Sequence, residues 1–132
     1  MNILFVCLGN TCRSIMAEAF FKSRKTKHKC SSAGIFAYHT IVTYTKNILK
    51  KYKLPIPKAK PTQLTKDMIA KADMVICMDR EISNFIHEKF RAGYGKIKVW
   101  EIADPYGMDF NAFVGVAQQV REKVDSLLNT LK

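Results

Sequence analysis

Cys7 and Arg13 lie in the segment CLGNTCRS (residues 7–14), where five residues separate them, directly after the apolar run at residues 3–6. A strand that ends in a short loop and turns into a helix points successive backbone N–H groups into one concavity, beside the positive end of the helix dipole. Such a concavity binds anions the size of phosphate. A cysteine at its floor favours the thiolate over the thiol, because the N–H dipoles and a neighbouring arginine stabilise the negative charge. The segment therefore combines a nucleophile with an anion site.

The same residue types suggest how this site would act on a phosphate ester. Attack of the Cys7 thiolate on phosphorus would give a cysteinyl-phosphate and divide one difficult step into two easier ones. The planar guanidinium of Arg13 matches two phosphoryl oxygens and opposes their charge, a task that metals perform in many other phosphoryl-transfer enzymes. We therefore expect no metal and no other cofactor. The alternative for Cys7 is an inert core cysteine at a strand end, which leaves Gly9, Arg13 and Ser14 unexplained.

Two polar residues of the loop have a functional and a structural interpretation. Ser14 could donate its hydroxyl to the Cys7 sulfur and improve it as a leaving group, or it could simply cap the helix. Asn10 could hold the loop through side-chain bonds to the backbone. The sequence favours neither interpretation for either residue.

Asp104 is a candidate proton donor for the leaving oxygen. Pro105 restricts the backbone of Asp104, and Gly107 permits a tight turn that would aim the carboxyl over the loop. The same carboxylate could then activate water in a second step. An Asp-Pro pair alone is typical of an ordinary turn, so the spacing does not decide the role. Asp79 and Asp109 are weaker candidates, and we interpret both as structural.

The segment VCLGNTCRS, the sequence MAEA at residues 16–19 and the sequence DPY at residues 104–106 together resemble the low-molecular-weight protein tyrosine phosphatase family. The resemblance covers essentially the whole chain. It implies that Asp104 is the general acid and that the loop holds the phosphate through Leu8, Gly9, Asn10, Thr11, Cys12, Arg13 and Ser14. Ile15 departs from the family pattern, which commonly has proline there. A proline would only preset the first helical turn, so the chemistry does not depend on it.

The resemblance also suggests roles for three aromatic residues and a second cysteine. Tyr106 resembles the family's aromatic wall beside the substrate ring, and Phe36 and Tyr38 could form the opposite wall. Ordinary loop packing explains these rings equally well. In similar proteins the second loop cysteine, here Cys12, can capture the oxidised Cys7 in a reversible disulfide, with simple packing as the alternative.

Composition limits the class of protein. A chain of 132 residues that is 48% hydrophobic predicts one domain over residues 1–132. No stretch approaches a membrane span, and the chain enters its first strand without the features of a signal peptide, so we expect a cytoplasmic protein with no membrane partner. The four cysteines show no disulfide framework, and Cys30 and Cys77 are interpreted as packing residues within buried strands. The histidines are scattered rather than clustered like metal ligands.

The net charge of +11 raises the possibility of nucleic-acid binding. Its main source is lysine in residues 22–29, 46–53 and 58–66, which we expect on helix faces and connecting loops rather than in an Arg-rich stripe with interleaved aromatics. We interpret these lysines as a solvated surface and expect no nucleic-acid partner. The positive field should instead attract phosphorylated substrates.

Short apolar runs alternate with amphipathic segments, which predicts an α/β fold with a four-stranded parallel sheet and helices on both faces, in three layers. The predicted strands are residues 3–6, 30–33, 74–78 and 97–100, and the predicted helices are residues 14–25, 41–52, 64–72 and 80–90. A last helix, from Phe113 to Leu131, repeats apolar residues at three- and four-residue steps and should pack across the sheet. Because ligands bind at the carboxyl ends of parallel strands, Cys7, Gly34, Asp79 and Asp104 should meet at one edge.

The leading hypothesis is a protein phosphatase that acts on phosphotyrosine and releases inorganic phosphate, as a monomer or weak dimer. Its closest alternative is an arginine phosphatase of the same fold, because relatives that act on phosphoarginine carry threonine where this chain has Thr11. An arsenate reductase is less favoured, since it needs a relay pair of cysteines after the third strand and no cysteine follows Cys77. A non-catalytic phosphate-binding module would be expected to lose Cys7, Arg13 or Asp104.

Overall fold

Four parallel strands form the centre of the fold, in the order β2-β1-β3-β4. The computed structural model describes residues 1–131. Its strands are β1 (Asn2–Cys7), β2 (Lys29–Gly34), β3 (Met74–Cys77) and β4 (Ile97–Val99). Every neighbouring pair runs parallel, which confirms the predicted sheet.

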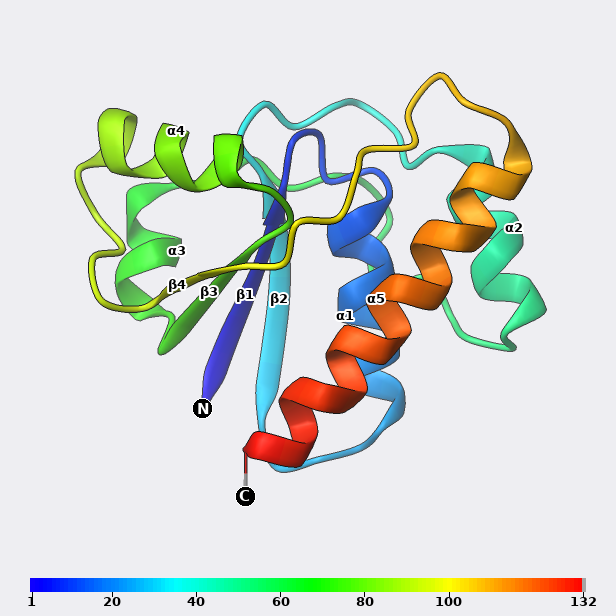
Figure 1. The fold of residues 1–132 in the computed structure, drawn as a ribbon, viewed down its shortest axis with the longest axis horizontal. Coiled ribbons are helices and arrows are strands. Elements are labelled where there is room, and N and C mark those ends of the chain that lie inside the picture. The colour runs from blue at the N-terminus through cyan, green and yellow to red at the C-terminus, as the bar shows by residue number, and fades with distance from the viewer. Residues whose placement is uncertain (132) are drawn as a thin grey trace.

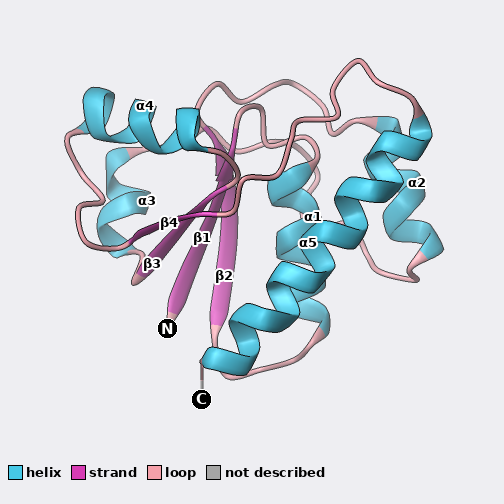
Figure 2. Ribbon diagram, in the orientation of Figure 1, coloured by secondary structure: helices cyan, strands magenta, loops and turns pink. Residues whose placement is uncertain are grey.

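Five helices cover the two faces of this sheet: α1 (Arg13–Ser23), α2 (Thr43–Lys51), α3 (Lys66–Lys71), α4 (Arg80–Phe90) and α5 (Phe110–Thr130). Figure 1 shows α1, α2 and α5 on one side, and α3 and α4 on the other. Figure 2 shows the strands as the layer between them. The predicted three-layer α/β fold is confirmed. Within residues 1–131, none of the helices combines the length and the apolar character needed to span a bilayer.

The central strand β1 explains why the first apolar run of the sequence is continuous. Ile3, Leu4, Phe5 and Val6 are each at most 1% exposed, because helices cover both faces of the strand. Parallel strands buried on both sides read as unbroken apolar runs rather than as alternating ones. This run carries the chain straight to Cys7.

Helices α1 and α5 pack differently from the sequence-based expectation. The sequence predicts an apolar stripe on one side of α1, yet all its residues from Arg13 to Phe21 are buried. The reason is that α1 lies against β1 and β2 and also against α5 and α2. Helix α5 was expected across the sheet, but its main contacts are with α1 and α2. Polar groups in the first two turns of α1 therefore lie in the interior of the protein.

The carboxyl ends of the strands meet at one edge, as predicted. Cys7 at the end of β1 pairs with Gly34 at the end of β2, and Val6 pairs with Cys77 at the end of β3. Cys77 in turn pairs with Val99 at the end of β4. Cys7 is the last residue of β1, and the segments that follow the strands carry the other predicted site residues.

Candidate active site

The Cys7 sulfur lies at the junction of β1, the loop and α1. The side chain is buried, and its Sγ accepts a hydrogen bond from the Asn10 backbone N–H at 3.2 Å. The Ser14 Oγ lies 2.8 Å from the same sulfur. Ser14 Oγ accepts from Asn10 Nδ2 at 2.7 Å. A Cys7 thiolate can only accept, so the Ser14 hydroxyl is the donor to the ionised sulfur. Two donors thus converge on Cys7, which stabilises a thiolate.

This geometry excludes the helix-cap role, one of the two interpretations of Ser14 that the sequence left open. Helix α1 begins at Arg13, and its N-cap is Cys12, which makes no side-chain capping bond. Ser14 therefore lies inside the first turn, and its hydroxyl contacts the sulfur rather than a backbone N–H.

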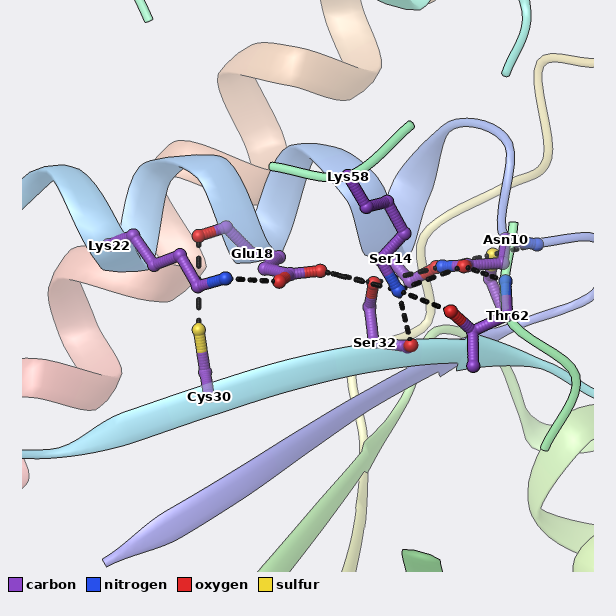
Figure 3. Close-up of polar contacts among 9 residues, drawn as sticks. Asn10, Ser14, Glu18, Lys22, Cys30, Ser32, Lys58 and Thr62 are labelled. Atoms are coloured by element: carbon purple, nitrogen blue, oxygen red, sulfur yellow. Dashed lines mark hydrogen bonds and ion pairs between the residues drawn. The ribbon is translucent and has the colours of Figure 1, made fainter. Parts of the chain in front are cut away.

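Asn10 holds the loop in an unusual backbone conformation. Its φ is 55°, in the left-handed region that asparagine tolerates better than most residues. The side chain is fully buried and uses both ends of its amide. Nδ2 also donates to Ser32 Oγ at 3.0 Å, and Oδ1 accepts from the Thr62 backbone N–H at 2.8 Å (Figure 3). The loop is therefore fastened to β2 and to the segment before α3, through partners that the sequence analysis missed.

Arg13 is held in place from three directions. Its side chain is 2% exposed, and Nη1 donates to Asp79 Oδ2 and to the Ile102 carbonyl, each at 2.8 Å. Nη2 lies 3.4 Å from Asp104 Oδ2. A guanidinium fixed in this way can present its remaining N–H groups to a phosphoryl group without losing side-chain freedom on binding.

Asp79 has a larger part in the site than the sequence suggested. Its Oδ1 accepts from the Ile82 N–H and caps α4, which is the structural role that we expected. Its Oδ2 also binds Arg13. Asp79 is therefore a positioning residue for the arginine, and nothing in its local sequence indicated this long-range pairing. Asp109 caps α5 through a bond from the Ala112 N–H, as its structural interpretation implies.

The turn after Asp104 brings its carboxyl to the loop. Gly107 has φ of +81°, and the Met108 N–H donates to the Pro105 carbonyl at 2.9 Å, which closes the predicted tight turn. Asp104 Oδ1 accepts from the Tyr106 N–H at 3.0 Å. The other carboxylate oxygen faces Arg13, so the turn does aim this acid at the site.

A cleft of about 430 Å³ opens beside these residues. Its lining comes from the loop, from the ends of three strands and from the start of α4: Leu8, Arg13, Ile35, Asp79, Arg80, Glu81, Ile82 and Asp104. The polar floor is Arg13 with its two carboxylates, and Leu8 and Ile35 supply apolar walls. The cleft is large enough for a phosphorylated side chain.

Phe36 and Tyr38 lie next to the loop because of main-chain pairing. The Phe36 N–H donates to the Leu8 carbonyl at 2.9 Å, and the Tyr38 N–H donates to the Gly9 carbonyl at 3.0 Å. Both side chains are exposed, and the Phe36 ring packs edge-on against Phe85, 5.0 Å between centroids. Tyr106 is also exposed, at 63%. The three rings are thus available at the surface near the loop, and their wall role remains a prediction.

Thr11 lies in the loop close to Tyr38. A methyl group placed on Gly9 would lie 3.5 Å from Thr11 Cγ2 and 3.8 Å from Tyr38 Cβ, so both side chains flank Gly9. The Thr11 carbonyl accepts a hydrogen bond from the buried Thr45 hydroxyl at 2.9 Å. Helix α2 therefore supports the loop from outside, a contact that the sequence analysis also missed.

The other three cysteines have raised pKa values. Burial raises the pKa of Cys12, of Cys30 and of Cys77 to about 12 in each case, so all three stay protonated at neutral pH. Cys77 is fully buried, as expected for a packing residue. Cys30 is only half-buried, because β2 is the edge strand and the first part of the strand is open to solvent.

Gly34 is required by the close approach of β2 to the loop. A Cβ on Gly34 would lie 2.7 Å from the Asn10 nitrogen, 2.7 Å from the Gly9 carbonyl carbon and 2.8 Å from the Leu8 oxygen. All three atoms belong to the backbone, so an alanine here must displace the loop itself.

We therefore predict that Gly34→Ala lowers both turnover and the free energy of unfolding, the latter by about 1–3 kcal/mol as for other overpacked sites. Gly115→Ala is the matched control, because nothing lies within 4 Å of its added methyl group in the second turn of α5. That change should stabilise the protein by up to about 1 kcal/mol. Urea unfolding and turnover assays check both variants. Wild-type stability and activity in Gly34→Ala would show that the loop tolerates displacement.

Comparison with known proteins agrees with this geometry. Residues 2–132 match the family described as low molecular weight phosphotyrosine protein phosphatase. The chain belongs to this family. The protein-tyrosine-phosphatase PtpB of Staphylococcus aureus is 30% identical over 100% of this chain and 97% of its own length. The protein-arginine-phosphatase of Bacillus subtilis is 29% identical, over 99% of this chain and 94% of its own length.

Solved structures of the low-molecular-weight phosphatases share the fold closely. The YwlE arginine phosphatase from Geobacillus stearothermophilus superposes with a TM-score of 0.92 at 29% identity, covering 98% of this chain and 92% of the other. Phosphatase activity is therefore the established class of reaction for this hydrolase. Relatives named as tyrosine phosphatases and as arginine phosphatases have similar sequence identity to this chain. Sequence identity therefore does not distinguish phosphotyrosine from phosphoarginine as the substrate.

The departure from the family pattern at Ile15 has a local explanation. Ile15 is fully buried and packs in a small cluster with Ala19, Ile41 and Leu49, which joins α1 to α2 and to the segment before it. An apolar side chain at this position secures the first turn of α1 by packing, where a proline would restrict the backbone.

Proposed function

We propose that this chain is a metal-independent protein phosphatase that works through a cysteinyl-phosphate on Cys7. The observation that carries the proposal is the convergence of the Ser14 hydroxyl and the Asn10 N–H on the Cys7 sulfur, beside a buried arginine that is paired with Asp104. A nucleophile, an anion clamp and an acid are therefore within one site. A structural cysteine would need none of these neighbours.

The first chemical step would transfer the phosphoryl group to sulfur. The Cys7 thiolate attacks phosphorus, the bond between phosphorus and the leaving oxygen breaks, and that oxygen takes a proton from Asp104. Arg13 and the loop N–H groups of residues 8–14, apart from the Asn10 N–H that donates to the sulfur, hold the equatorial oxygens throughout. Because Arg13 supplies the positive charge, the scheme assigns no step to a metal ion.

The second step would hydrolyse the cysteinyl-phosphate. Asp104, now a carboxylate, takes a proton from water as the water oxygen attacks phosphorus, and the phosphorus–sulfur bond breaks. The sulfur leaves as a thiolate that accepts the Ser14 hydrogen bond. Inorganic phosphate is released. Turnover in the presence of EDTA tests the metal independence, and activity that appears only after zinc or magnesium is added would contradict it.

We propose phosphotyrosine on proteins as the main substrate, with the chain acting as a monomer or weak dimer. The exposed rings of Phe36, Tyr38 and Tyr106 could bind an aromatic leaving group, and stacking of this kind is worth about 0.5–1.5 kcal/mol. Phosphoarginine is the second candidate, because Thr11 places a hydroxyl-bearing side chain beside Gly9 in the loop. Rates on the two substrates, measured side by side, distinguish them.

Thr11→Ile should lower phosphoarginine hydrolysis far more than phosphotyrosine hydrolysis, because it removes the hydroxyl and adds apolar bulk. A site that hydrogen-bonds part of its substrate can discriminate by as much as about 10⁴-fold, whereas methylene-scale differences give only about 10–200-fold. Thr11→Ser keeps the hydroxyl and is the control that should retain phosphoarginine activity. No phosphoarginine activity in the wild type, together with unchanged phosphotyrosine rates in Thr11→Ile, would make Thr11 a neutral loop residue.

Mild peroxide should inactivate the enzyme reversibly through a disulfide between Cys7 and Cys12. Peroxide would oxidise the Cys7 thiolate to a sulfenic acid, and attack by Cys12 would form the S–S bond and expel the oxygen as water. Because burial raises the pKa of Cys12 to about 12, the disulfide should form faster as pH increases. Cys12→Ser should make the loss irreversible. Mass spectrometry of the oxidised wild type identifies the partner of Cys7. A disulfide from Cys7 to Cys30, or an over-oxidised Cys7, would contradict a protective role for Cys12.

A further inference from the structure

Lys58 differs from the other lysines of its segment. The sequence predicts a solvated surface position for all lysines of residues 58–66, and for Lys58 this prediction is wrong. Its side chain is 17% exposed, whereas the side chain of Lys60, two residues later, is exposed. The Lys58 Nζ lies between α1, β2 and the loop, partly shielded from solvent (Figure 3).

The ammonium of Lys58 has a complete set of acceptors. Nζ donates to the Ser32 carbonyl at 2.7 Å, to Thr62 Oγ1 at 3.0 Å and to Asn10 Oδ1 at 3.2 Å. Its charge is compensated by Glu18, whose Oε1 lies 3.6 Å away. Burial lowers the pKa of Lys58 and Glu18 opposes that shift. A partly buried ammonium whose three protons all have acceptors is typical of a built site rather than of a surface charge.

Glu18 is part of the same network. It is 3% exposed in the second turn of α1, accepts from the Ser32 hydroxyl on Oε1 and pairs with Lys22 through Oε2. Figure 3 shows the chain of contacts running from Lys22 and Glu18 through Ser32 to Asn10 and Ser14. The last member of this chain is the Cys7 sulfur.

The orientation of the Asn10 amide determines what the sulfur receives. An ammonium and a backbone N–H can only donate, so Lys58 and Thr62 both require the oxygen end of the amide. The nitrogen end must then face Ser14 and Ser32, to which it donates. Because the Asn10 amide offers Ser14 a donor and no acceptor, the Ser14 hydrogen remains available to a Cys7 thiolate, which can only accept. With the amide reversed, Ser14 would donate to the amide oxygen and the sulfur would lose that bond.

We propose that Lys58 is a positioning residue for catalysis: together with the Thr62 N–H it fixes the Asn10 amide, and in this way it directs the Ser14 hydroxyl to the Cys7 sulfur. The inference rests on the proposed function, in which Cys7 is the nucleophile and leaving group. It adds a residue outside the loop, 51 positions from Cys7, that controls the hydrogen bonding of that nucleophile. The segment of residues 54–62, whose prolines exclude regular structure, is thereby given a function.

The test compares Lys58→Met with Lys60→Met, which removes an exposed lysine from the same segment. The rate at which iodoacetamide alkylates Cys7 is followed against pH by mass spectrometry, and kcat and KM are measured in parallel. Lys58→Met should move the midpoint of the alkylation profile upward by about one pH unit, as expected for a thiolate that loses a hydrogen bond. The value of kcat should fall about 10–100-fold with a smaller change in KM. Lys60→Met should match the wild type in both measurements.

Removing Lys58 alone leaves Glu18 buried with one exposed partner, and this could prevent folding. The double variant Glu18→Gln/Lys58→Met lacks both charges of this pair. It replaces Lys58→Met in the test if the single variant does not fold, and Glu18→Gln is then the reference. Relative to that reference, the double variant should still show the upward shift. An unshifted profile in Lys58→Met, or a double variant with the profile of Glu18→Gln, would overturn the proposal.

Failure of the inference is distinguishable from failure of the proposed function. Alkylation of Cys7 is read without turnover, so a Lys58 effect on the thiol is visible even if another residue proves to be the nucleophile. Conversely, an inactive Cys7→Ser variant with an unshifted Lys58→Met profile would keep the mechanism and remove only Lys58 from it.

Discussion

Cys7→Ser should abolish turnover, with a loss of about 10⁴-fold or more, because the serine hydroxyl is not ionised where the thiol is stabilised as a thiolate. The substitution changes one atom, and the donors around it stay in place. Asn10 is held by Ser32 and Thr62, and Arg13 by Asp79 and the Ile102 carbonyl, independently of the sulfur. Binding of inorganic phosphate, measured by titration calorimetry, should therefore change little.

The matched control for this variant is Cys30→Ser, which alters a half-buried thiol on the edge strand, away from the loop. It should retain wild-type turnover. If the Cys7→Ser variant keeps even a tenth of the wild-type activity, Cys7 is not the nucleophile.

Asp104→Asn should slow hydrolysis by about 10²–10⁴-fold, the usual contribution of a general acid. The loss should be larger for an alkyl phosphate than for an activated aryl phosphate, because a poor leaving group needs the proton more. The structure indicates that Asp104→Asn leaves the position of Arg13 unchanged. Arg13 keeps its bonds to Asp79 and Ile102 when the weaker pairing to Asp104, at 3.4 Å, is removed.

Asp109→Asn is the control for the acid. Asp109 follows Asp104 by five residues and caps α5, and asparagine is an equally good N-cap. It should leave both rates unchanged. If Asp104→Asn slows the alkyl and aryl phosphates equally, Asp104 positions the turn and does not donate a proton.

The parts of the site that the sequence predicts are those close together in the chain. Cys7, Asn10, Arg13 and Ser14 all lie in residues 7–14, from the end of β1 to the start of α1. Residue types and spacing were therefore enough to indicate a nucleophile beside an anion site. The strands were predicted to within one residue at each end, because buried parallel strands form continuous apolar runs. Asp104 required the family resemblance, since an Asp-Pro turn by itself has no specific chemical meaning.

The parts that the sequence did not predict are contacts between distant segments. Asp79 binds Arg13 across 66 positions, and Thr62 binds Asn10 across 52. Gly34 appeared only as a strand end, although its missing side chain is what admits the loop backbone. Lys58 looked like one more surface lysine. In each case the local sequence is ordinary, and the role arises only from the register of β2 and the course of the segment before α3.

The most direct test of the cysteinyl-phosphate mechanism is to trap the intermediate. The Asp104→Asn variant is mixed with an activated aryl phosphate, which needs little help in the first step but leaves the second step without a base. The reaction is quenched in acid within milliseconds to seconds, and the modified residue is located by mass spectrometry. The account predicts phosphate on Cys7 that disappears on longer incubation. Phosphate on any other residue, or none on the protein while product forms in a burst, would contradict it.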